Sequence, residues 1–90
     1  MAKRVDGNQA EIVQALRRCG CSVQTLHTVG HGCPDLLVGF AERDYLLEIK
    51  NGTQARLNSR EQRWHSDWRG QVAVVRTVEE ALRAVGIPIA

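Results

Sequence analysis

Two acidic residues and a lysine lie where neighbouring segments of the chain can bring them together. Asp35 precedes an apolar run at 36–40, and Glu48 and Lys50 stand near the end of the next β-prone segment, 45–50. Alternate residues of a strand project from the same face. A hairpin of the two segments would therefore gather two carboxylates and an ammonium. Two hard oxygen ligands can hold Mg²⁺ and leave part of its octahedral shell to water or phosphate oxygens.

Such a group of side chains is suited to hydrolysing phosphodiester bonds. The metal can activate water and stabilise the charge that develops on the phosphate. An adjacent Lys50 can orient or deprotonate the attacking water, or stay charged and stabilise the developing anion. A plainer interpretation is also open. Asp35 would then only turn the chain, and the residues at 48 and 50 would form a solvated strand edge.

The elements that must position these residues indicate an α/β domain with a mixed sheet of about four strands flanked by helices. A first helix is expected up to Gly20, with Asn8 and Glu11 as a capping box. The order is αβββαβα, and the 90 residues form one domain, 1–90. The other expected elements are strands at 21–29, 36–40, 45–50 and 72–75, a helix from Asn58 or Ser59 to about Arg69, and a helix capped by Thr77 and Glu80.

Two further expectations concern burial. The apolar run 36–40 is typical of a strand that is covered on both faces. Trp64 and Trp68 lie four residues apart on the predicted helix and are expected to pack in the core, rather than to stack on bases. The same helix has Glu61 or Gln62 to complete a capping box at its start.

At these positions the chain resembles the PD-(D/E)xK nucleases and, within them, the VRR-NUC branch. The match spans nearly the whole chain: Glu11 on a helix, G-x-P-D-L at 32–36, E-x-K at 48–50, residues 57–62 for an L-[ST]-x-x-Q helix, and V-A-V-V-R at 72–76. Asn58 stands where the family usually has Ser or Thr, and Asn caps helices equally well. With five elements in the family order, the catalytic interpretation is favoured over the solvated strand edge.

The resemblance implies a restriction-endonuclease-like core and a Mg²⁺-dependent DNA endonuclease in which Mn²⁺ can substitute. The implied catalytic residues are Asp35, Glu48, Lys50, Glu11 and Gln62. The implied metal ligands are the side chains of Asp35 and Glu48 and the backbone carbonyl of Ile49. Lys50 would position the attacking water. Helix capping accounts for Glu11 and Gln62 as well as catalysis does.

DNA is the expected partner, although a formal net charge of +2 is by itself a weak indication of a polyanionic ligand. Arg56, Arg60 and Arg63 cluster on one short segment. They can bind phosphates without reading base sequence, and they can equally form a solvated helix face.

A homodimer acting on a four-way (Holliday) junction is the expected form of the enzyme, with a role in DNA recombination and repair. One small domain has little surface for gripping a long duplex, and two-fold symmetry would supply paired active sites. Small stand-alone members of the VRR-NUC branch resemble resolvases of this kind. Tyr45, Leu46 and Val85 are candidates for the dimer interface. A flap nuclease, a general duplex nuclease and a non-catalytic DNA-binding accessory module are the alternatives.

The N-terminal residues lack the apolar stretch of a signal peptide, and the three cysteines are an odd number, so reduced thiols and a cytoplasmic protein are expected. A small zinc-stabilised interaction protein is the remaining class, with ligands drawn from Cys19, Cys21, His27, His31 and Cys33. The Cys-x-Cys spacing disfavours it, because the usual knuckle has two intervening residues.

Overall fold

The structure is a computed structural model that describes residues 6–89, so residues 1–5 and 90 of the predicted domain lie outside the described part. The predicted order αβββαβα is confirmed. Within residues 6–89 no helix is both long enough and apolar enough to span a membrane. The elements are α1 (Gln9–Arg18), β1 (Ser22–Thr25), β2 (Leu36–Phe40), β3 (Arg43–Ile49), α2 (Ser59–Asp67), β4 (Ala73–Val75) and α3 (Val78–Ala84).

The four strands form one mixed sheet in the order β1-β2-β3-β4. The pairs β1–β2 and β2–β3 are antiparallel, and the pair β3–β4 is parallel. A parallel pair needs a crossover connection, which α2 provides. The turn between β2 and β3 is tighter than the four residues expected. Ala41 and Glu42 both have positive φ, 51° and 63°, as two-residue turns with the twist of a hairpin require.

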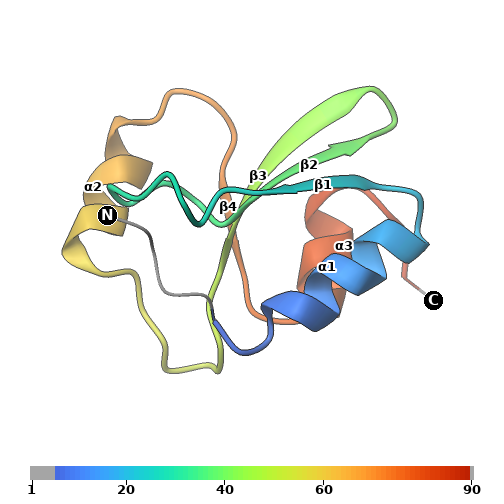
Figure 1. Cartoon of the computed structure of the whole chain (residues 1–90), viewed down its shortest axis with the longest axis horizontal. Helices are drawn as coiled ribbons and strands as arrows, with labels where there is room; N and C mark the ends of the chain where they lie inside the picture. Colours follow the sequence, from blue (N-terminus) through green and yellow to red (C-terminus); the bar gives the residue numbers. More distant parts are fainter. Residues whose placement is uncertain (1–5, 90) are drawn as a thin grey trace.

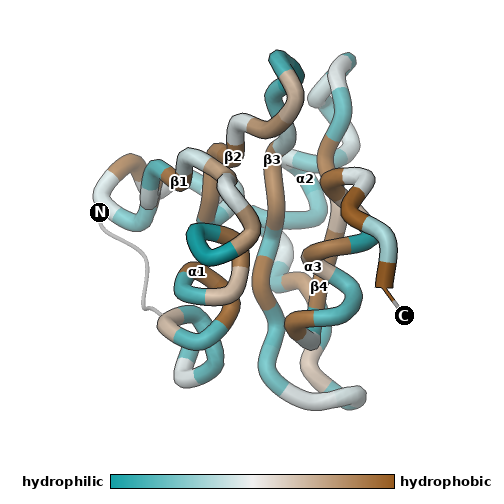
Figure 2. Tube along the Cα trace, turned by 90° about the vertical axis from the view of Figure 1, so that its right-hand side faces the viewer, coloured by the Kyte–Doolittle hydropathy of each residue, from teal (hydrophilic) through white to brown (hydrophobic). Residues whose placement is uncertain are grey.

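One face of the sheet is covered by α1 and α3, which lie side by side (Figure 1). In Figure 2 the hydrophobic stretches of β3 are seen between these two helices. The apolar residues that alternate along β2 and β3 meet the inward faces of the helices there, as their period predicts. The main core residues are Ile12, Val13 and Leu16 of α1, Leu36, Val38, Leu47, Ile49 and Val75 of the strands, and Ala81 and Val85 at the C-terminal end.

The opposite face of the sheet is covered only in part. Helix α2 reaches Glu48 and Lys50, at one end of β3. Away from that end, Leu37 is 38% exposed, so the prediction that β2 is covered on both faces is wrong. Leu37 pairs with Leu46 across the hairpin, and both side chains line an apolar hollow of about 350 Å³.

The start of α1 differs from the prediction. Asn8 does not cap the helix with its side chain, so the expected Asn8–Glu11 capping box is wrong. The Asn8 amide instead donates to the carbonyl oxygens of Lys50, at 3.2 Å, and Arg76, at 3.0 Å. These two carbonyls follow the C-terminal ends of β3 and β4. The amide therefore joins the beginning of α1 to the edge of the sheet where the candidate site lies.

The two tryptophans lie outside the core, so the prediction that they pack in it is wrong. Trp68 is 44% exposed and Trp64 is half-buried. Their rings stack on each other with centroids 4.7 Å apart and planes at 21°. The face of α2 that meets the sheet carries Glu61 and His65 instead, since both side chains contact residues of the β3 end. The tryptophans stand on the adjoining face of the helix.

Candidate active site

Asp35 lies where the 30–34 loop enters β2, and only 1% of it is exposed. Its Oδ2 accepts a hydrogen bond from the backbone N–H of Ile49 at 2.6 Å, and its own N–H donates to the carbonyl of Leu47 at 3.0 Å. The ladder between β2 and β3 ends at the pair Leu36 and Leu47, so Ile49 has no partner residue on β2. The Asp35 carboxylate supplies the acceptor that the ladder no longer provides, and this bond fixes the carboxylate against β3.

Glu48 and Lys50 complete the group of three. The pairing of Leu36 with Leu47 brings Asp35 next to Glu48 on the neighbouring strand, and directly opposed residues share a face. Lys50 Nζ lies 4.0 Å from Glu48 Oε2. Glu48 is fully buried, so the alternative interpretation of this segment as a solvated strand edge is wrong. The structure thus brings the three predicted residues together at one end of the hairpin.

The nearest carboxylate to Lys50 is that of Glu61, on α2. Glu61 Oε1 lies 2.7 Å from Lys50 Nζ, and Glu61 is 1% exposed. The same oxygen accepts the backbone N–H of Asn58 at 3.0 Å, while Asn58 Oδ1 accepts the N–H of Glu61 at 2.9 Å. This is the predicted capping box, confirmed with Asn58 as its first residue. One carboxylate therefore begins the helix and holds the candidate catalytic lysine.

Gln62 and Glu11 lie apart from these contacts. Gln62 is exposed, and its side-chain amide donates to the carbonyl of Leu57 at 3.0 Å, at the start of its own helix. Glu11 is exposed in the first turn of α1. Counting the motif L-[ST]-x-x-Q from Leu57 leads to position 61, where this chain has Glu61 in place of the glutamine.

His65 is a site residue that the sequence analysis missed. Its Nε2 lies 3.8 Å from Glu48 Oε1, and its side chain is 15% exposed. His65 follows Glu61 by four residues, which brings both side chains to the same face of α2. The ring of Trp64 meets the His65 ring edge-on, with centroids 6.0 Å apart. The Glu-x-x-x-His spacing beside a predicted strand was the available signal.

The loop before Asp35 packs directly on the start of α2. Gly32 has a φ of 82°, and a Cβ there would lie 2.4 Å from the carbonyl oxygen of Arg60. Only glycine allows this approach. Its neighbour His31 also has a positive φ, 59°, which is uncommon outside glycine. The loop that delivers Asp35 and the helix that delivers Glu61 are therefore held in fixed relation.

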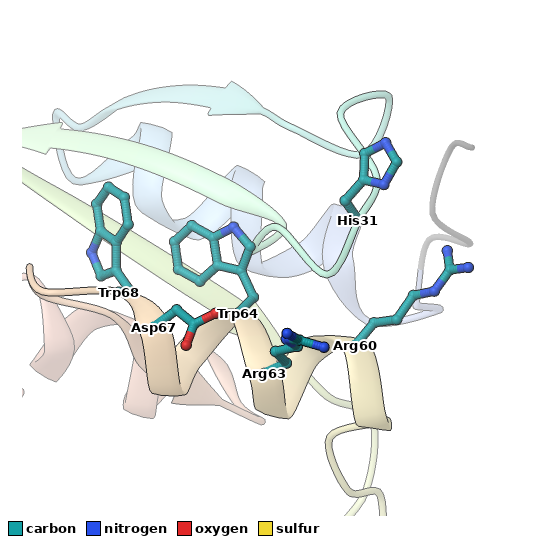
Figure 3. A pocket seen from close by; sticks show the side chains of 6 residues that line it. All are labelled: His31, Arg60, Arg63, Trp64, Asp67 and Trp68. Atoms are coloured by element: carbon teal, nitrogen blue, oxygen red, sulfur yellow. The ribbon is translucent and has the colours of Figure 1, made fainter.

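Two of the three predicted DNA-binding arginines border an open groove of about 440 Å³ between α2 and the loop that carries His31 (Figure 3). Its lining residues are His31, Arg60, Arg63, Trp64, Asp67 and Trp68. Arg60 and Arg63 are exposed. Arg56 is exposed on the segment before the helix, outside this set of lining residues.

The residues considered for zinc do not form a cluster. Across residues 6–89, no three His, Cys, Asp or Glu side chains are arranged as a metal-holding group. Cys19 is exposed and Cys21 is buried. Burial first, and the nearby Cys19 second, raise the pKa of the Cys21 thiol, which disfavours the thiolate that zinc requires.

The donors at the end of β3 are of the kind that can bind magnesium. Asp35 and Glu48 offer carboxylate oxygens, and the carbonyl of Ile49 lies between Glu48 and Lys50 in the chain. These are the hard oxygen ligands that Mg²⁺ takes in small numbers, alongside water or phosphate. Two buried carboxylates also need positive charge or hydrogen-bond donors close by, and the N–H of Ile49 and the ammonium of Lys50 are such groups here.

Comparison with known proteins adds no relative. No family model matches this chain, and neither does any curated protein or solved structure. The fold is α/β, with a four-stranded mixed sheet and the three helices of the described region. Function is argued below from the side chains gathered at the end of β3.

Proposed function

We propose that this chain is a Mg²⁺-dependent DNA endonuclease with a PD-(D/E)xK core of the VRR-NUC type. One observation carries the proposal. Two buried carboxylates, Asp35 and Glu48, stand on neighbouring strands at the same end of a hairpin, with the ammonium of Lys50 two residues further on. Burying charged groups costs stability unless they are paired. Such an arrangement favours a functional role for the group over a purely structural one.

Each residue of the group has a separate task. Asp35 and Glu48 would hold the metal with the Ile49 carbonyl, and the bound ion would activate water and offset charge on the phosphate. The N–H of Ile49 orients the Asp35 carboxylate. Lys50 donates from its ammonium to the attacking water or to a phosphate oxygen, and Glu61 keeps that ammonium at the site.

The DNA backbone would run along the groove between α2 and the His31 loop. Arg60 and Arg63 are exposed on the helix that carries Glu61 and His65 inward. One guanidinium group can donate two hydrogen bonds to a phosphate at once, and this contact does not depend on the base sequence. Arg56 extends the same basic segment toward the loop after β3.

The acting form belongs to the same proposal: a homodimer that cuts a four-way junction. The apolar hollow beside Leu37, Tyr45 and Leu46 supports self-association, because a partner would cover side chains that α2 leaves open. Val85, the third predicted interface residue, is 1% exposed in the core, so it is not available for an interface. Light scattering would give the mass in solution, and a stable monomer would contradict this part.

A cleavage assay tests the activity itself. The whole chain is incubated with junction, flap and linear duplex DNA, in Mg²⁺ and in EDTA. Cleavage is expected in Mg²⁺ alone, with the junction cut fastest. Glu48→Gln removes one ligand charge with almost no change in shape and should abolish cleavage, whereas Arg83→Ala on α3 should cleave as the wild type does. Metal-independent cleavage, or full activity of Glu48→Gln, would refute the proposed centre.

A further inference from the structure

The groove between α2 and the His31 loop carries an aromatic surface near the candidate active site. The stacked rings of Trp64 and Trp68 form one wall of the groove, and His31 and the two arginines border the rest (Figure 3). Trp64 also touches the ring of His65, whose Nε2 lies 3.8 Å from Glu48. The contacts from the groove to the buried Glu48 carboxylate therefore run through Trp64 and then His65.

The two tryptophans leave apolar surface open in the groove, and Trp68 also borders the apolar hollow beside Leu37 and Leu46. Trp68 is one of the few large apolar side chains that stand open to solvent among the described residues. Indole rings stack on nucleobases of any type, because every base has a π-face. A base inside a duplex has both faces covered by its neighbours, whereas an unpaired nucleotide offers an open face to the indole.

The charges around the groove complement a nucleic-acid strand. Arg60 and Arg63 are exposed and border the groove, and Asp67 is the acidic member of the described lining. Single-stranded nucleic acids are bound by this combination of aromatic side chains for the bases and basic side chains for the backbone. The contact of Gly32 with the Arg60 carbonyl fixes the His31 side of the groove against α2.

We infer that the groove binds an unpaired nucleotide of the DNA, with its base stacked on the Trp64–Trp68 pair and its phosphates held by Arg60 and Arg63. The inference rests on the proposed nuclease activity only for its further consequence, that this nucleotide flanks the bond that is cut. Among linear duplexes, one with unpaired nucleotides at an end is therefore expected to be preferred over a fully paired one.

Intrinsic fluorescence tests the binding step without cleavage. The chain has two tryptophans, both in this groove, so quenching reports on the groove directly. The whole protein is titrated in EDTA with a short oligothymidylate and with a blunt-ended duplex. We expect saturable quenching by the single strand at about tenfold lower concentration than by the duplex. Equal quenching by the two, or none by either, would overturn the inference.

Variants assign the binding to the rings. Because Trp68→Ala loses the tryptophan signal of one ring, its affinity is measured by anisotropy of a labelled oligothymidylate. It should fall by about five- to a hundredfold, the range for loss of one base stack, with Trp68→Phe less affected and Arg83→Ala unchanged. Circular dichroism checks that each variant is folded. Wild-type affinity in Trp68→Ala would overturn the inference, as would a loss explained by a change in oligomeric state on light scattering.

Cleavage in Mg²⁺ separates this inference from the proposed function. A duplex with an unpaired tail and a fully paired duplex of the same sequence are compared, and the wild type should prefer the tailed one while Trp68→Ala loses the preference. Cleavage without quenching would remove the nucleotide site and leave the nuclease. Quenching without cleavage of any substrate would remove the nuclease and leave the site.

Discussion

The two faces of the sheet are held by different forces. On one face, apolar side chains of α1 and α3, such as Leu16, pack with those of the sheet, such as Ile49. On the other, α2 meets the sheet through ionisable groups, with Glu61 on Lys50 and His65 near Glu48. Apolar burial stabilises the fold directly. The attraction between buried charges is largely offset by the cost of removing them from water, so it adds little net stability. The first face maintains the domain, and the second carries its chemistry.

The largest effect is expected on the apolar face. Leu47→Ala removes a fully buried side chain and should lower the free energy of unfolding by about 2–5 kcal/mol. Leu37→Ala is the matched control on the other face, where the leucine is partly exposed, and should cost about 1 kcal/mol or less. Urea unfolding of both variants measures the difference. Similar losses would mean that the two faces do not differ as described.

On the polar face the effect should appear in turnover rather than in stability. Glu48→Gln keeps the shape of a fully buried side chain but removes its charge, and we expect cleavage to fall by at least about a hundredfold. Its melting temperature should stay close to that of the wild type. Glu79→Gln, on the exposed side of α3, is the control and should leave both quantities unchanged.

Asp35 connects the two properties, since its carboxylate also accepts the N–H of Ile49. Asp35→Ala leaves that buried donor without its acceptor and should destabilise the fold by about 1–3 kcal/mol. Asp35→Asn retains an oxygen for the hydrogen bond, so it should be more stable than the alanine variant while remaining inactive. Thermal unfolding with parallel cleavage assays tests this. Identical stability of the two variants would show that the hydrogen bond contributes nothing.

The smallest effect separates the two roles of Glu61. Glu61→Gln can still complete the capping box with Asn58 but loses the ion pair with Lys50, and we expect about a tenfold loss of turnover with the fold unchanged. Glu61→Ala should in addition lose about 1 kcal/mol of stability with the cap. Wild-type turnover in Glu61→Gln would leave Glu61 as a helix cap only.

Much of the fold could be predicted because it follows local patterns. The alternation along 45–50 separates Leu47 and Ile49 from Glu48 and Lys50, and the two apolar side chains lie in the core. Asn8 shows the limit of such patterns. Its sequence context matched a capping box, yet its amide bonds to Lys50 and Arg76, which lie far away in the chain. A local motif cannot reveal a distant acceptor.

The sequence by itself determined the group Asp35, Glu48 and Lys50, because a strand alternates its side chains by two residues and a short hairpin aligns neighbouring strands. Only the tertiary structure decided the contribution of α2. Successive residues of a helix point about 100° apart, so the rotation of α2 about its own axis decides which of Glu61 and Gln62 faces the sheet. The packing of the Gly32 loop and the Glu48 end of β3 sets that rotation. This rotation turns Glu61 toward the sheet and leaves the tryptophans at the surface. The sequence of α2 alone does not determine it, because it depends on contacts with the other two segments.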